Sequence, residues 1–104
     1  MNQRKRNSEI LWVPCQIPIL RPSSGGICIS LIIPHNPVTA WVGPKQVKII
    51  EQFADDKYLR GLLRCKMLSE DNLNYFVEYV DRGTRKRTWI PKAWLAKAMK
   101  EQPQ

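Results

Sequence analysis

The distribution of prolines constrains this chain more than any other feature. Six of its eight prolines lie within residues 14–44, and none lies within residues 45–90. Proline cannot donate a backbone hydrogen bond, and it interrupts helices and central strands. We therefore expect short strands and turns in the first range and longer, uninterrupted strands in the second.

Two short strands are predicted in the proline-rich range. Residues 27–33 are rich in β-branched side chains, follow a Ser/Gly-rich turn signal and end at Pro34. Residues 38–42 form the second candidate, which ends before Gly43. Prolines and apolar residues crowd residues 11–44, which we expect to form either an extra layer on a barrel or a surface for a larger partner.

Alternation of apolar and polar side chains is cleaner in the second range. In the strand expected at residues 63–67, the apolar side chains share one face. Arg64 and Lys66 lie on the opposite face. The expected elements, in order, are a strand at 63–67, a polar turn at 69–72, a strand at 73–80, a tight turn at 81–84 and a short strand around 88–90.

A short helix is expected at the end of the chain. Pro91 suits the first turn of a helix, and apolar residues at helical spacing follow it.

Several short strands, Gly/Pro turns and one terminal helix together predict a small, mainly β barrel. A chain of this size needs most of its large apolar residues in the core, so we expect packing roles for Trp12, Trp41, Trp89 and Trp94.

Length and composition indicate one ordinary globular domain. The 104 residues are 43% hydrophobic and 25% charged, with a net charge of +8. No apolar stretch approaches the roughly 18–20 residues of a membrane span. The three cysteines are widely spaced and form no CxxC pair, so we expect neither a disulfide framework nor a zinc site, and we expect a reduced, intracellular chain.

Catalytic constellations are not recognisable in the sequence. The one histidine, His35, falls in a turn-like setting, whereas nucleophilic triads and most metal sites need a histidine with positioned partners. The pair Asp55 and Asp56 is expected in a solvated turn. We therefore predict a protein that is not an enzyme and needs no metal or cofactor.

Three segments carry a resemblance to a known family. Residues 53–63 (FADDKYLRGLL), 76–84 (FVEYVDRGT) and 89–95 (WIPKAWL) resemble the opening, the central strand with its turn, and the closing segment of Tudor domains, in the Royal superfamily. Residues 27–42 are similar to the lead-in of extended Tudor domains. The resemblance implies an SH3-like barrel with extra N-terminal strands and a short C-terminal helix.

The resemblance also implies a division of the chain into three parts. Residues 1–10 are expected to form a basic, disordered tail. Residues 11–50 would supply proline-rich strands and turns that pack on or extend the barrel. Residues 51–100 would supply the Tudor-like barrel core and the C-terminal helix.

Tudor domains hold methylated arginine or lysine in a cage of aromatic rings, whose faces attract a cation. The matching cage is degraded here. An arginine replaces the tyrosine of the turn, where it repels a cationic ligand, and a threonine replaces the asparagine. The positions implied for a degraded cage or a peptide-binding site are Phe53, Tyr58, Tyr79, Arg82 and Thr84.

Two binding functions follow from these features. The first is a non-catalytic, Tudor-like interaction module for a protein or peptide, which includes a peptide added as a strand along a sheet edge. The alternative is a nucleic-acid or chromatin-binding barrel, whose basic side chains would contact DNA or RNA phosphates or an acidic protein surface. Either function implies a nuclear location or a cytoplasmic ribonucleoprotein granule. The basic candidates are Arg82, Arg85, Lys86, Arg87 and Lys92.

Overall fold

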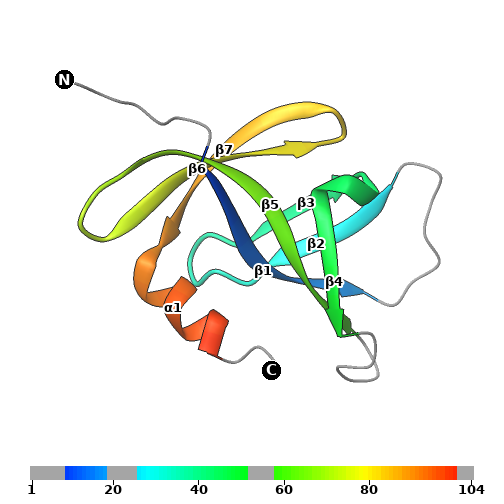
Figure 1. The fold of residues 1–104 in the computed structure, drawn as a ribbon, viewed down its shortest axis with the longest axis horizontal. Coiled ribbons are helices and arrows are strands. Elements are labelled where there is room, and N and C mark those ends of the chain that lie inside the picture. The colour runs from blue at the N-terminus through cyan, green and yellow to red at the C-terminus, as the bar shows by residue number, and fades with distance from the viewer. Residues whose placement is uncertain (1–8, 19–25, 52–57, 101–104) are drawn as a thin grey trace.

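The structure is a computed structural model that describes residues 9–18, 26–51 and 58–100. This part of the chain forms seven strands, one turn of 3-10 helix and one α-helix (Figure 1). The elements are β1 (Ile10–Pro18), β2 (Ile27–Leu31), β3 (Val38–Val42), η1 (Pro44–Gln46), β4 (Val47–Glu51), β5 (Tyr58–Glu70), β6 (Asn74–Asp81), β7 (Thr84–Pro91) and α1 (Lys92–Lys100).

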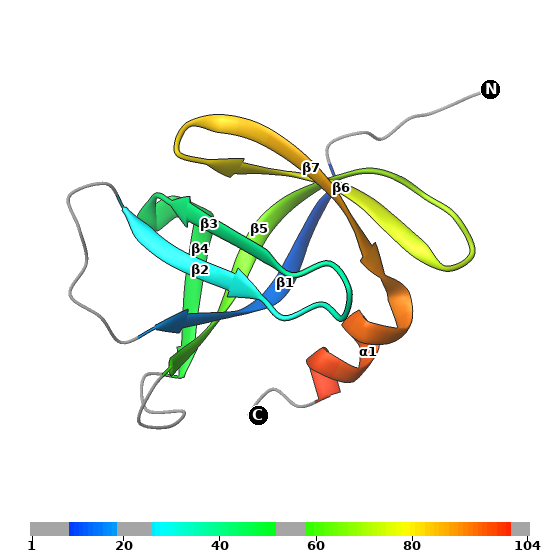
Figure 2. The same cartoon turned by 180° about the vertical axis from the view of Figure 1, so that it is seen from behind.

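The described strands belong to one antiparallel sheet. Six follow the order β3-β2-β1-β5-β6-β7, and β4 pairs with β5 off this path. Figures 1 and 2 show that the sheet curls strongly into a half-barrel, with α1 below it. The prediction of a small, mainly β, barrel-like fold with a short C-terminal helix is confirmed.

The long strand β5 organises the sheet. Its pairing with β1 extends from Tyr58 opposite Pro18 to Lys66 opposite Ile10. The other edge of β5 pairs first with β4 and then, after residue 65, with β6. Residues 11–50 and 51–100 therefore contribute strands to the same sheet, and β4 lies where the sequence predicted no strand.

The prolines near the N-terminus do not divide the chain as expected. β1 passes through Pro14 and ends at Pro18, although proline is usually confined to strand edges and bulges. The exception has a physical reason. The register pairs β1 with β2 only at Gln16, so none of the described strands lies against the β2-side edge of β1 at Pro14.

Some sequence predictions fall outside the described residues. Phe53, Asp55, Asp56 and the turn at residues 21–25 are among them, as are residues 1–8 of the expected tail. Ile10, the last residue of that tail, is the first residue of β1.

The core is formed by the inward-facing side chains of the curled sheet and by Leu95 of α1. Trp12, Trp41 and Trp94 are half-buried. The packing role predicted for Trp89 is wrong, because its side chain is 45% exposed. Successive strand residues face opposite sides, and Ile90 occupies the core side of β7, so Trp89 faces outward.

A cluster of hydrogen bonds joins β3 to the β6–β7 hairpin. The predicted tight turn is present, with φ of 55° at Arg82 and 80° at Gly83, as a type I′ turn requires. The Arg82 amide donates to the Trp41 carbonyl at 2.8 Å, and the Trp41 amide donates to Asp81 Oδ1 at 2.8 Å. These bonds close the curl of the sheet by holding the two regions together.

Two other predicted turns are present, although the polar turn expected at residues 69–72 begins later, because β5 continues through Glu70. His35 has a φ of 67°, and the Asn36 amide donates to the Ile33 carbonyl at 3.1 Å, so the predicted turn at His35 is confirmed. Between β5 and β6, Asp71 accepts hydrogen bonds from the amides of Leu73 at 2.8 Å and Asn74 at 2.7 Å. These bonds hold the pKa of Asp71 below its usual value.

Candidate functional site

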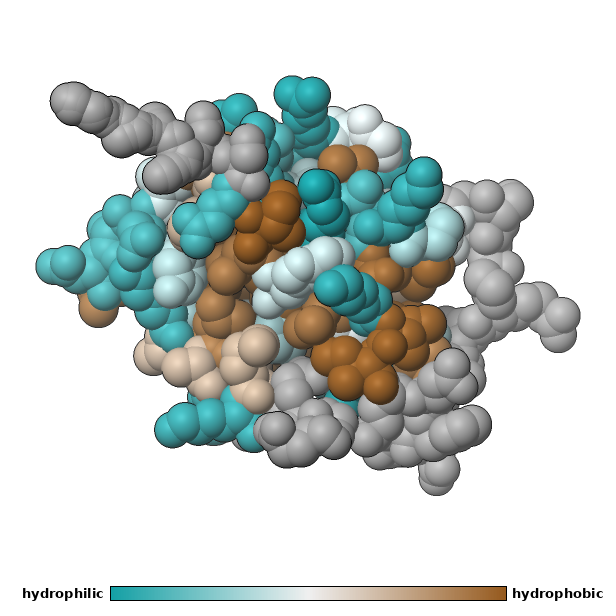
Figure 3. Space-filling model, viewed as in Figure 1, coloured by the Kyte–Doolittle hydropathy of each residue, from teal (hydrophilic) through white to brown (hydrophobic). Residues whose placement is uncertain are grey.

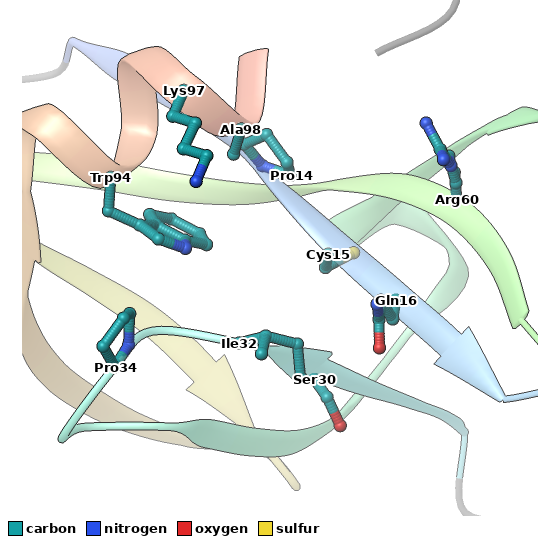
Figure 4. A pocket seen from close by; sticks show the side chains of 10 residues that line it. All are labelled: Pro14, Cys15, Gln16, Ser30, Ile32, Pro34, Arg60, Trp94, Lys97 and Ala98. Atoms are coloured by element: carbon teal, nitrogen blue, oxygen red, sulfur yellow. The ribbon is translucent and has the colours of Figure 1, made fainter. Parts of the chain in front are cut away.

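A groove opens where β1 and β2 separate. Its walls are the middle of β1, the end of β2 with the loop that follows, and the inner side of α1 (Figure 4). The groove has a volume of about 410 Å³, within the range of small-ligand and peptide pockets. Its position results from the fold, because α1 packs on β1 and β7 at the end of the half-barrel where the β1–β2 pairing stops.

The lining combines an apolar floor with polar groups at its margins. In Figure 4 the Trp94 indole projects from α1 toward Pro34 and Ile32 on the facing loop. Ile32 is 53% exposed, so a large apolar side chain lies in the open groove. The polar groups come from Gln16, Ser30, Arg60 and Lys97, and the remaining lining residues are Pro14, Cys15 and Ala98.

Basic side chains take part in the lining of the groove. Two of its described lining residues, Arg60 and Lys97, are basic, and none of the described lining residues is acidic. Cys15 does not add a negative charge, because burial raises the pKa of its thiol to about 12 and keeps it protonated near neutral pH. The groove therefore suits a ligand that carries carboxylates and an apolar side chain, and it offers no thiolate nucleophile.

One strand edge beside the groove has no described strand paired with it. In the described part of the chain no strand pairs with the β2-side edge of β1 between Ile10 and Cys15. An extended peptide adds to such an edge through backbone hydrogen bonds. The groove thus lies next to a surface on which a peptide strand has partners.

The two predicted cage tyrosines in the described part of the chain do not come together, and Phe53 lies outside that part. Tyr58 starts β5 and is half-buried, whereas Tyr79 of β6 is only 8% exposed and belongs to the core. The register places Glu78 opposite Lys66, so Tyr79 lies level with Cys65, at the other end of the β1–β5 ladder from Tyr58. Burial raises the pKa of the Tyr79 phenol.

The two turn positions of the predicted cage are separate from the groove. The Arg82 guanidinium lies over the Trp41 ring, 5.9 Å from its centroid. Thr84 is exposed and pairs with Asp81 at the base of the hairpin turn. Neither residue lines the groove.

The predicted basic surface is divided between the two faces of the β6–β7 hairpin and partly neutralised. Arg85 and Arg87 lie on the outer face, and Lys86 lies on the inner face. Three of the five predicted cations form ion pairs, namely Lys86 with Asp81 at 3.0 Å, Arg87 with Glu78 at 3.3 Å and Lys92 with Glu70 at 2.6 Å.

Sequence reasoning missed the groove residues. Trp94 and Ala98 were recognisable as an apolar stripe of a helix, but a stripe alone does not show what it faces. The exposure of Ile32 follows from the loop after β2, and the opening of the groove follows from the point where β1 and β2 stop pairing. No local pattern in the sequence marks either feature.

Other exposed apolar side chains gather over β4. In Figure 3 brown atoms occupy the lower right of the molecule, where β4 lies in Figure 1, and teal atoms surround the two hairpins. Ile49 and Ile50 are the exposed apolar residues of β4.

No group of three or more histidine, cysteine, aspartate or glutamate side chains in the described ranges is placed to hold a metal ion. Within the same ranges, no helix is long and apolar enough to cross a membrane. Comparison of the chain with protein-family models, with curated proteins and with solved structures finds no match.

Proposed function

We propose that this chain is a non-catalytic interaction module of Tudor-like character that binds an acidic, extended peptide of a protein partner. The observation that carries the proposal is the groove between α1, β1 and the loop after β2, with its basic and apolar lining. Indirect support comes from Tyr58 and Tyr79, the described cage tyrosines, which lie apart, whereas recognition of a methylated side chain would need the cage residues together.

Binding in the groove would use three kinds of contact. Trp94 and Ile32 would pack against an apolar side chain of the peptide, which is removed from water. Lys97 would attract a neighbouring carboxylate and so raise the rate of encounter with acidic partners. Backbone groups on the unpaired edge of β1, other than the Pro14 nitrogen, which carries no hydrogen, would supply hydrogen bonds that depend little on peptide sequence.

The test is a titration of the ¹⁵N-labelled protein with two peptides of equal length, one alternating Glu and Leu and the other alternating Lys and Leu. We expect the acidic peptide alone to give saturable amide shifts at Gln16 and Ser30 and at the Trp94 indole. Equal responses to both peptides, or shifts that avoid the groove, would overturn the proposal.

Two variants of α1 provide a matched comparison. Lys97→Glu reverses a charge that lines the groove, whereas Lys100→Glu reverses an exposed charge on the same helix outside it. We expect Lys97→Glu to weaken acidic-peptide binding by about tenfold and Lys100→Glu to change it much less. Equal losses of peptide affinity in the two variants would indicate attraction by overall charge and would contradict binding in the groove.

A third arm tests recognition of methylated side chains. The protein is titrated with a peptide containing symmetrically dimethylated arginine and with its unmethylated twin. The proposal predicts no difference between the two peptides. Saturable shifts near Tyr58 or Tyr79 with the methylated peptide alone would show a working cage and replace the groove as the binding site.

A further inference from the structure

A second surface lies on the outer face of β5, β6 and β7, away from the groove lining. The register places Lys66 opposite Glu78 and Glu78 opposite Arg87, so these three side chains form a row across the sheet. Side chains two positions apart on a strand share a face, which adds Phe76 and Trp89 on one side of the row. We call this set, with Arg85, the outer sheet face.

The aromatic pair is the first feature of this face that indicates a ligand. Phe76 and Trp89 are directly opposite each other, with ring centroids 4.6 Å apart and planes tilted by 35°. The Phe76 ring packs against the indole, and Trp89 is 45% exposed. A large, supported and exposed ring is suited to stacking against another planar group.

The charge around the pair is the second feature. Lys66, Arg85 and Arg87 are exposed, and the ladder places only one carboxylate, that of Glu78, among them. Glu78 is engaged, since its Oε2 accepts a hydrogen bond from Arg87 Nε at 3.3 Å, and its side chain is only 13% exposed. The face therefore has an excess of positive charge beside an exposed ring.

We propose that the outer sheet face binds single-stranded nucleic acid. A base would stack on Trp89, and phosphates would lie along Lys66, Arg85 and Arg87. Base stacking and backbone neutralisation are the two contributions on which binding of single strands without sequence preference depends. A duplex fits less well, because its bases are already stacked and do not present a face to Trp89.

The test measures anisotropy of fluorescein-labelled oligothymidylate and oligouridylate, with a duplex of equal length and with polyglutamate as a competitor. We expect both single strands to bind more tightly than the duplex and polyglutamate to compete weakly. The affinity should fall steeply as salt rises. A preference for the uridylate or the thymidylate would identify RNA or DNA as the source of the ligand.

Substitutions at Trp89 separate stacking from a structural role. Trp89→Leu should weaken single-strand binding by about five- to a hundredfold, and Trp89→Phe should retain most of the affinity because a ring remains. If Trp89→Leu binds as wild type does while its circular dichroism shows a folded chain, or if polyglutamate competes as well as the oligonucleotide, the proposal fails.

Charge substitutions give a second, independent readout. Arg85→Gln should reduce the slope of log affinity against log salt by about one, because one phosphate contact is removed. Lys45→Gln, on exposed η1, is the control and should leave the slope nearly unchanged. Lys97→Glu should weaken peptide binding in the groove by about tenfold and leave stacking at Trp89 intact, so the two proposed sites fail separately. An equal loss from all three substitutions would show attraction by overall charge and overturn the proposal.

Discussion

At the scale of single residues, the Asp81 carboxylate joins β3 to the β6–β7 hairpin. It is the buried charged residue of the described chain, with 7% exposure. One carboxylate oxygen accepts the Trp41 amide, and the other pairs with Lys86. The hydrogen bond from the Trp41 backbone is the main cause that lowers its pKa from the usual 3.8, and Lys86 and Arg82 lower it further.

Asp81→Ala should destabilise the fold by about 1–3 kcal/mol, because the half-buried Trp41 amide loses its acceptor. Lys86→Met, which removes only the exposed partner of the ion pair, should cost at most about 1 kcal/mol. Urea unfolding at neutral pH measures both changes. Similar losses for the two variants would contradict the assigned role of the amide bond.

The pH dependence of Asp81 follows from the direction of its pKa shift. Because the folded-state pKa is lowered, the ionised carboxylate contributes stability above the unfolded value of 3.8, and this contribution is lost as pH falls through the folded value. The stability difference between wild type and Asp81→Asn should therefore shrink as the solution is acidified. A difference that is constant from neutral to acid pH would count against this account.

The three cysteines differ in how deeply their thiols are buried. All three are free thiols, and burial raises the pKa of Cys15 and Cys65 to about 12. Iodoacetamide at mildly alkaline pH should modify half-buried Cys28 first in the folded protein, and all three in urea. Mass spectrometry of digested protein measures the order.

Raised thiol pKa values also mean that folding stability falls as pH rises above about 9, the usual thiol value.

At the scale of elements, the β4–β5–β1 contact depends on one glycine. A Cβ atom on Gly61 would lie 2.7 Å from the Lys48 carbonyl oxygen of β4 and 3.0 Å from Ile17 Cδ1 of β1. The carbonyl is part of the backbone and cannot turn aside as a side chain does. Gly61 therefore permits both strands to lie close to β5.

Gly61→Ala should lower the free energy of unfolding by about 1–3 kcal/mol, since β4 must move away from β5. Gly43→Ala is the matched control. A Cβ there has no atom within 4 Å, and its φ of −79° suits alanine, so the change should stay within about 0.5 kcal/mol. Denaturation monitored by circular dichroism measures both, and equal effects would show that the close approach is unimportant.

At the scale of the whole molecule, the net charge of +8 acts against compactness. Three described cations are in ion pairs with carboxylates, and the excess of positive charge remains after them. The groove and the outer sheet face both draw on this excess, at different places on the surface.

Moderate salt should raise the melting temperature by a few degrees, because it screens repulsion among the excess cations more than it weakens the three ion pairs of the described residues. Thermal unfolding at low and at physiological sodium chloride measures the effect. A lower melting temperature in salt would mean that the ion pairs outweigh the repulsion.

The sequence by itself determined the local features. Alternation at residues 63–67 set Leu63 and Cys65 inward and Arg64 and Lys66 outward, as the structure confirms. The turn at residues 81–84 and the terminal helix were also predictable, whereas the turn expected at 69–72 was placed two residues too early, because β5 ends at Glu70. These features depend on neighbouring residues, because the period of a strand and the backbone freedom of Gly83 are local properties.

Only the tertiary structure decided which strands pair and where they separate. β1 and β5 are distant in sequence, so no local pattern fixes their register or shows that Pro14 lies beside an open edge. The same non-local pairing places Trp89 against Phe76 and Asp81 against Trp41. The alternation of residues along a strand predicts which face of the sheet a side chain occupies, but it does not predict which residues of other strands lie beside it. Both candidate binding surfaces consist of residues that only strand pairing and helix packing bring together.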